Sequence, residues 1–234
     1  SLSLFIKKYK YFFFIMVDQS INKLNLIQDN INKLNENNLV KTEIICVSKT
    51  FSINKLQPLI DYGQVHFGEN KVKEAEEKWG NIKLNNTKLK LHMIGKLQSN
   101  KAKKAVKLFD FIHSLDNVKL AKLLKKSEEE LKKKISYFIQ VNIGEESQKS
   151  GVPPGEIKDF FQFCTDEIKL NIIGLMVIPP NDKNTDKYFE QVSELNSNLG
   201  LNHLSMGMSS DYQKAIKFKS TFLRIGSAIL GERN

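Results

Sequence analysis

EIICVSKTFSINKLQPLIDYGQVHFGEN, residues 43–70, is the stretch of sequence that decides the fold. It opens on an apolar β-rich run at residues 43–47, passes through a helix candidate at residues 53–62 and reaches a second β-rich run at residues 65–67. Two short strands joined through a helix predict one β/α unit, because parallel strands need a crossover connection that a helix usually provides. The fold class therefore depends on how often this unit recurs along the chain.

The same alternation continues almost to the C-terminus. The β-rich runs predict strands at residues 43–47, 65–67, 91–94, 109–112, 137–141, 172–177, 203–206 and 222–225. The segments between them predict helices at residues 53–62, 71–79, 100–108, 117–131, 154–163, 186–195 and 211–218. Strict alternation in 234 residues without a linker is typical of a single α/β domain folded as a (β/α)8 barrel of the TIM type, rather than of an open sheet.

The residues before the first strand predict a leading helix and an extension. In residues 19–35 the apolar side chains recur at steps of three and four, which predicts one amphipathic helix. In this interpretation residues 1–17 are an N-terminal extension and residues 18–234 are the barrel domain. The apolar run at residues 11–17 is too short to span a bilayer, which takes about 20 residues. Met16 is the expected initiator, and a mitochondrial presequence is the alternative, although the extension has no arginine.

The chain is basic, with 36 lysines and arginines, 26 acidic residues and a formal net charge of +10. Such a charge raises the question of nucleic-acid binding. In the densest basic stretch, however, Lys125, Lys126 and Lys132 bracket Glu128 and Glu129, which is typical of a solvated helix face of mixed sign. We therefore expect neither a nucleic acid nor a membrane as a partner, and we expect a monomer.

The two cysteines indicate a reducing compartment. Cys46 lies inside an apolar run, where a thiol behaves as a small hydrophobe, and Cys164 is far from it in the sequence. Neither cysteine belongs to a CxxC motif, so we expect no disulfide and no metal centre. The expected location is the cytoplasm, with mitochondria as the alternative.

In a barrel of this kind the chemistry belongs to the loops that follow the carboxyl ends of the strands. Lys49 stands directly after the first predicted strand. Near apolar walls and another cation its amine would lose solvation and its pKa would fall, which is how a lysine becomes a nucleophile toward aldehydes. The alternative is one more lysine that reaches into solvent.

Two turns, at residues 205–211 and 224–228, follow the seventh and eighth predicted strands, which is a frequent phosphate position in such barrels. Ser209 and Ser227 offer hydroxyl donors there, although both serines could instead cap helices. Arg224 is one of only two arginines in the chain, which suggests a place that requires a rigid, permanently charged guanidinium. Its alternative role is an ordinary salt bridge. By position alone, we expect His92 to be a core histidine, and we expect Met176 to form part of a wall rather than to act as a ligand.

Taken together, these motifs resemble the pyridoxal phosphate homeostasis protein family. The N-terminal half contributes VSKT at 47–50, FGEN at 67–70, HMIG at 92–95, LQSNK at 97–101 and HSLD at 113–116. The C-terminal half contributes QVN at 140–142, EES at 145–147, KSG at 149–151, GLM at 174–176, LSMGMSSD at 204–211 and RIGSAILG at 224–231. The resemblance runs in order from about residue 41 to residue 231, and is far more specific than any single motif.

The resemblance implies a barrel similar to the N-terminal domain of alanine racemase, with pyridoxal 5'-phosphate (PLP) at its mouth. In that family the lysine that matches Lys49 forms a Schiff base with PLP, two serine-bearing turns hold the phosphate, and an arginine faces the pyridine nitrogen. The cofactor-binding residues that it implies are Lys49, Asn70, His92, Met176, Ser205, Met208, Ser209, Arg224, Gly226 and Ser227. Lys71, Leu91 and Lys96 depart from the family pattern, and these departures concern the rim of the pocket.

The expected function is PLP binding in vitamin B6 cofactor homeostasis without robust catalysis, with PLP-dependent apoenzymes as candidate recipients. An arginine at the pyridine nitrogen disfavours its protonation, and so disfavours transaminase or decarboxylase chemistry. Because the sequence ends at Asn234, we expect no counterpart of the second domain that supplies a tyrosine base in racemases similar to this barrel. The alternatives are a PLP-dependent amino-acid racemase, a basic nucleic-acid-binding module, and a barrel that binds another phosphorylated ligand.

Overall fold

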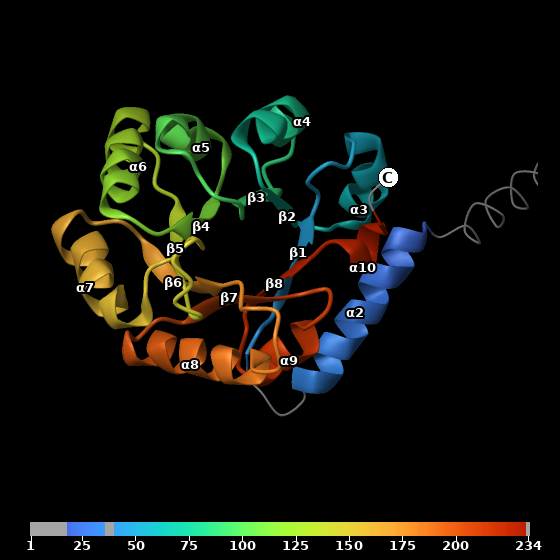
Figure 1. Cartoon of the computed structure of the whole chain (residues 1–234). Helices are drawn as coiled ribbons and strands as arrows, with labels where there is room; N and C mark the ends of the chain where they lie inside the picture. Colours follow the sequence, from blue (N-terminus) through green and yellow to red (C-terminus); the bar gives the residue numbers. More distant parts are fainter. Residues whose placement is uncertain (1–17, 36–39, 233–234) are drawn as a thin grey trace, which may run out of the picture.

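The structure, a computed structural model, describes residues 18–35 and 40–232 and is built around one closed barrel of parallel strands (Figure 1). The strands follow one another around the barrel in chain order, and β8 pairs with β1 to close it. Their bounds are β1 Glu43–Val47, β2 His66–Glu69, β3 Lys90–Met93, β4 Phe111–Leu115, β5 Ser136–Val141, β6 Ile172–Val177, β7 His203–Met208 and β8 Phe222–Ile225. The predicted TIM-type barrel with a leading helix is confirmed.

Helices cover the outside of the barrel (Figure 1). They are α2 Gln19–Asn35, α3 Ile53–Tyr62, α4 Val72–Asn85, α5 Ala102–Leu108, α6 Val118–Leu131, α7 Ile157–Gln162, α8 Thr185–Asn198, α9 Tyr212–Lys217 and α10 Ser227–Leu230. Single turns η1 Ser99–Lys101 and η2 Pro154–Glu156 precede α5 and α7, and a π-helical turn, η3 Phe163–Glu167, follows α7.

The leading helix completes the outer ring of helices. The last helix, α10, has only four residues, which is too short to cover the strands where the barrel closes. Helix α2 contacts α3, α9 and α10 and fills this place beside the closure (Figure 1). Its apolar stripe is buried there through Leu24, Ile27 and Ile31. The predicted amphipathic helix therefore belongs to the barrel itself.

Three of the differences from the predicted bounds have clear local reasons. Helix α4 continues past Gly80 to Asn85, because Ile82 still packs against the core. Phe109 ends α5 rather than beginning β4, and its N–H donates to the carbonyl of Ala105. The helix predicted at residues 154–163 divides into η2, α7 and part of η3, and Pro154 stands at the first position of η2, where its missing N–H costs no helical hydrogen bond.

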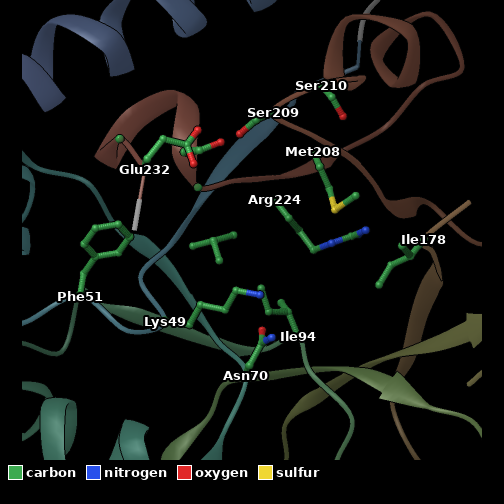
Figure 2. A pocket seen from close by; sticks show the side chains of 14 residues that line it. Lys49, Phe51, Asn70, Ile94, Ile178, Met208, Ser209, Ser210, Arg224 and Glu232 are labelled. Atoms are coloured by element: carbon green, nitrogen blue, oxygen red, sulfur yellow. The ribbon is translucent and has the colours of Figure 1, made fainter. Parts of the chain in front are cut away.

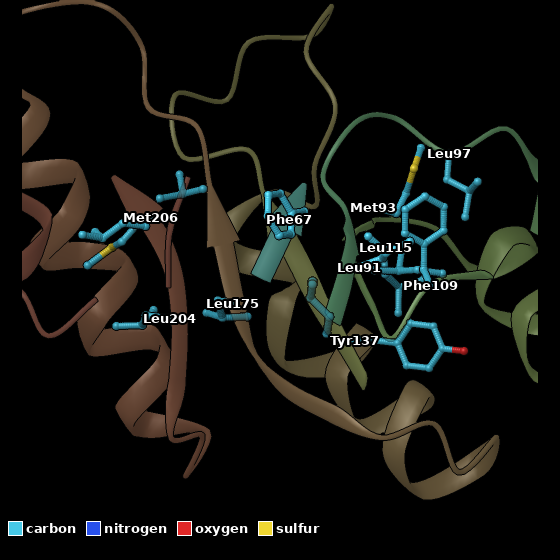
Figure 3. Close-up of a cluster of buried hydrophobic side chains, with 14 of the residues drawn as sticks. Phe67, Leu91, Met93, Leu97, Phe109, Leu115, Tyr137, Leu175, Leu204 and Met206 are labelled. Carbon is cyan, nitrogen blue, oxygen red and sulfur yellow. The ribbon is translucent and has the colours of Figure 1, made fainter. Parts of the chain in front are cut away.

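The main hydrophobic core lies between the barrel and its helices. Strand side chains that point outward, such as Phe67, Leu91 and Leu175, belong to this cluster together with apolar side chains of the helices (Figure 3). Trp79 of α4 is fully buried in the same cluster. A smaller cluster, formed by Ile45, Phe138, Met176 and Phe222, is separate from it. Ile44 and Cys46 belong to the main cluster while Ile45 between them belongs to the small one, as the alternation of side chains along a strand requires.

The small cluster adjoins three histidines of neighbouring strands. The His92 ring stacks on Phe111 and the His113 ring stacks on Phe138, each with ring centroids 4.3 Å apart. Burial lowers the pKa of both imidazoles well below 6.5. His66, on β2, is partly buried and its pKa is also lowered, mainly by burial. The histidines are therefore neutral in the folded protein at neutral pH.

The mixed-sign face of α6 and the unpaired cysteines are found as predicted from the sequence. On α6, Lys125 approaches Glu129 and Lys126 approaches Glu130 at one-turn spacing, which is the expected face of mixed sign. Cys46 and Cys164 are free and buried. None of the helices that the structure describes is long and apolar enough to cross a bilayer.

Residues 1–17 lie outside the described residues, so the extension, the initiator Met16, the presequence alternative and the domain boundary stay predictions.

The neutral histidines make stability depend on pH. Since His92 and His113 are neutral imidazoles in the folded state, each takes up a second proton when the chain unfolds below pH 6.5. We predict that the free energy of unfolding falls as pH decreases below this value, by about 1.4 kcal/mol per pH unit for each of them. Urea unfolding at about pH 7.5 and about pH 5.5 measures the difference. A constant free energy of unfolding between these conditions would contradict the prediction.

Candidate functional site

A cavity of about 470 Å³ opens at the carboxyl ends of the strands (Figure 2). Figure 2 shows Lys49, Asn70 and Ile94 on one side of it, and Met208, Ser209 and Ser210 on the other. Seven of the ten residues implied by the family resemblance line it: Lys49, Asn70, Met208, Ser209, Arg224, Gly226 and Ser227. The loops after β1, β2, β7 and β8 therefore converge on one cavity.

The loop that carries Lys49 turns sharply after β1. Its half-buried lysine precedes Thr50, which has a φ of 68°, a conformation that a β-branched residue rarely adopts. The N–H of Thr50 donates to Oε1 of Glu74 at 2.5 Å, and the N–H of Phe51 donates to the carbonyl of Ser48 at 3.1 Å. The bonds from Thr50 and Lys78 hold the pKa of Glu74 below its usual value, although burial alone would raise it.

A buried carboxylate anchors this loop from behind. Oε1 of Glu69, which is fully buried, accepts from Oγ of Ser48 at 2.7 Å, from Nε1 of Trp79 at 2.9 Å and from Nζ of Lys78 at 2.9 Å. Lys78 also donates to the carbonyl of Ser48 at 2.8 Å. We call Ser48, Glu69, Lys78 and Trp79 the loop anchor. The sequence interpretation missed it, although a glutamate that alternates with apolar residues at a strand end is a signal for a buried ionic contact.

Arg224 reaches the cavity from the interior of the barrel and is held by neutral acceptors. Its Nη1 donates to the carbonyl and to Oγ of Ser205, at 2.7 and 2.6 Å, and its Nη2 donates to the carbonyl of Val177 at 2.8 Å. Within residues 18–35 and 40–232, no carboxylate forms an ion pair with it. Burial lowers the pKa of Arg224 to about 10, and Asp211 opposes this effect. The side chain is therefore still charged at neutral pH.

The two serine turns meet across the ends of β7 and β8. Gly207 has a φ of 98°, which glycine adopts readily, and begins the first turn. Asp211 closes it, because its Oδ1 accepts from the N–H of Met208 at 2.7 Å. The N–H of Ala228 donates to Oγ of Ser209 at 3.2 Å and so joins the second turn to the first. Ser227 is exposed to the cavity at the start of α10.

Three of the implied residues do not line the cavity. His92, Met176 and Ser205 are fully buried and lie on strands β3, β6 and β7. Ser205 is behind the cavity wall, where it bonds to Arg224, rather than on the open part of the serine turn. The structure therefore separates these three from the seven that surround the cavity.

Of the three residues that depart from the family pattern, only Lys96 lies at the rim of the cavity. Lys96 lines a second cavity of about 320 Å³ that shares Asn70, Ile94 and Ile178 with the first. Leu91 is buried in the outer core and Lys71 is exposed before α4. Gly95 allows this arrangement, because a Cβ at this position would lie 2.5 Å from the carbonyl oxygen of Asn70.

The fold and the cavity define a barrel of the alanine racemase N-terminal class. The family model described as "Alanine racemase, N-terminal domain" matches residues 23–234. An alanine racemase from Clostridium difficile 630 has a TM-score of 0.69 at 14% identity, over 92% of this chain and 57% of that chain. At this identity the likeness concerns the fold alone.

Nearer relatives define the family within this class. A pyridoxal phosphate homeostasis protein of Haemophilus influenzae is 36% identical over 226 residues, which are 91% of this chain and 95% of the relative. A structure of PipY from Synechococcus elongatus PCC7942 with PLP bound is 32% identical, with a TM-score of 0.76 over 87% of this chain and 99% of that one. The chain belongs to the pyridoxal phosphate homeostasis protein family, and the resemblance seen in the sequence is confirmed.

We predict that neutralising the carboxylate of the loop anchor lowers the stability of the protein strongly. Glu69→Gln would leave the buried ammonium of Lys78 with weaker compensation, so the free energy of unfolding should fall by about 3 kcal/mol. Urea unfolding measures this loss. Lys73→Gln is the matched control, because it removes only the exposed pair with Glu77 and should cost less than about 0.5 kcal/mol. Equal losses in the two variants would contradict the role of the anchor.

Proposed function

We propose that this chain binds PLP in the cavity, carries it as a Schiff base on Lys49, and serves vitamin B6 cofactor homeostasis. The observation that carries the proposal is the convergence of an amine, a guanidinium and two serine turns on one cavity. PipY, which is similar over nearly its whole length, has been solved with PLP bound. The names of the curated relatives support the same cofactor.

The donor set of the cavity fits PLP. Val47, Ile94 and Ile178 supply apolar walls for an aromatic ring, and the amine of Lys49 can condense with its aldehyde. The hydroxyls of Ser209 and Ser227 are donors of the kind that hold a phosphate. The carboxylate of Glu232 also lines the cavity, but this residue is exposed and can turn to solvent.

The remaining residues of the cavity receive their proposed roles from their positions around it. Asn70 and Met208 border the ring from opposite sides, and Gly226 lets the backbone approach the phosphate. Arg224 faces the pyridine nitrogen. The other three implied residues, His92, Met176 and Ser205, act from behind the cavity wall rather than by touching the cofactor.

We propose that cofactor binding, and not turnover, is the main activity. When it is bound, PLP supplies an electron sink for carbanions if its pyridine nitrogen is protonated. The charge of Arg224, held by neutral acceptors, opposes that protonation. The rival function, an amino-acid racemase, also requires a second acid or base at the site. We further propose a monomer in the cytoplasm that passes PLP to apoenzymes.

The lysine assignment predicts a covalent label at one position. The protein incubated with PLP should absorb in the visible range, and borohydride should fix one PLP per chain on Lys49, as mapped by peptide mass spectrometry. Lys49→Ala should lose both the absorbance and the label. Lys96→Ala is the control, because its amine lines only the adjoining cavity and its removal should leave the label in place. A label that persists in Lys49→Ala would overturn the proposal.

The binding role predicts negligible turnover of amino acids. The PLP-loaded protein should convert L-alanine to D-alanine at less than about one thousandth of the median enzyme turnover of 10 per second. Chiral chromatography of the product measures this conversion, and borohydride labelling in the same sample verifies that the cofactor is present. Racemisation near ordinary enzyme rates would favour the rival function.

A further inference from the structure

Three histidines join Arg224 in one hydrogen-bonded chain that the proposed function does not require. Nδ1 of His66 lies 2.9 Å from Nε2 of His92, and Nδ1 of His92 lies 2.8 Å from Nε2 of His113. Nδ1 of His113 lies 2.8 Å from Oγ of Ser205, and this oxygen accepts from Nη1 of Arg224 at 2.6 Å. We call these five side chains the histidine chain. It runs from β2 through β3 and β4 to β7 and β8.

Arg224 fixes the direction of every bond in the chain, because a guanidinium donates and never accepts. Oγ of Ser205 therefore accepts from Arg224, and its own hydrogen is directed to Nδ1 of His113. A neutral His113 whose Nδ1 accepts must carry its proton on Nε2 and donate to His92. By the same step His92 donates through Nε2 to His66. The opposite order would leave the buried hydroxyl hydrogen of Ser205 without an acceptor, which is costly.

The chain also stays neutral beside a full positive charge. The two central imidazoles, His92 and His113, are fully buried, and the field of Arg224 adds to burial in lowering the pKa of His113. Burial and this field both disfavour a second proton on His113. The neutral chain therefore holds the guanidinium in place without reducing its charge.

We propose that Ser205, His113, His92 and His66 are positioning residues that act on Arg224 as one ordered chain and keep its charge directed at the bound ring. The proposal rests on the proposed function for the identity of that ring. It does not require the histidines to contact the cofactor. It also explains why polar side chains occupy a barrel interior that apolar residues usually fill.

The first test needs no cofactor. Long-range ¹H–¹⁵N spectra of the imidazoles in the unloaded protein should show His92 and His113 as neutral tautomers protonated on Nε2. In Arg224→Met the donor that orders the chain is missing, so the Nδ1-protonated form should appear. A wild-type protein in which either histidine carries its proton on Nδ1 would overturn the proposal, whatever the cofactor.

The second test compares two replacements of His113. Asparagine places an acceptor oxygen near the position of Nδ1 and can still receive the Ser205 hydrogen, whereas leucine cannot. His113→Leu should raise the Kd for PLP about tenfold, and His113→Asn should stay within about threefold of wild type. The Kd for an analogue with C–H in place of the ring nitrogen should be unchanged in both variants. His203→Gln, exposed and outside the chain, is the control.

Equal losses of affinity for PLP and for the analogue would assign the chain a merely structural role, and no loss in His113→Leu would also contradict the proposal. His92→Phe provides a second interruption if His113→Leu does not fold, because a ring can still stack on Phe111. It should raise the Kd for PLP and not that for the analogue. If the wild-type protein fails to bind PLP, the proposed function is wrong, while the tautomer spectra still test the chain.

Discussion

The pairing of β8 with β1 is the constraint on which the site depends. Ile45 pairs with Arg224 and Cys46 pairs with Ile225, so the first and last strands are neighbours in the closed barrel. Because the strands are parallel, the loops that follow them open at the same end, and Lys49 faces the same cavity as Ser227. The Lys49 amine and the serine hydroxyls of the proposed phosphate site come from distant parts of the sequence, and the closure of the barrel brings them together.

Much of the fold was predictable from the sequence because local patterns decide it. The alternation of short β-rich runs with helical segments is repeated often enough to identify the barrel, and β1 and β6 match their predicted bounds. The four-residue α10 was not predicted, since no periodicity develops over so few residues. The role of α2 in the helix ring depends on contacts with α9 and α10, which no local pattern contains.

Site residues could be predicted from the sequence where their position at a strand end brings them to the cavity. Residues that act through hydrogen bonds to other side chains could not be predicted in this way. Lys49 and Arg224 stand at strand ends, and both line the cavity. The loop anchor and the histidine chain join residues of several strands, so their partners become visible only in three dimensions. Ser205 illustrates the difference, because it sits in a motif that resembles a phosphate turn and yet bonds to Arg224 behind the wall.

The place of α2 beside α10 has a consequence for how the molecule is made. A ribosome synthesises α2 before β8 and α10, so the seam between these elements forms only after residues 222–230 have been made. Until then the apolar stripe of α2 has no native partner among the C-terminal elements. Helix α2 can pack against α3 before that point, and its stripe reaches its full set of neighbours only afterwards.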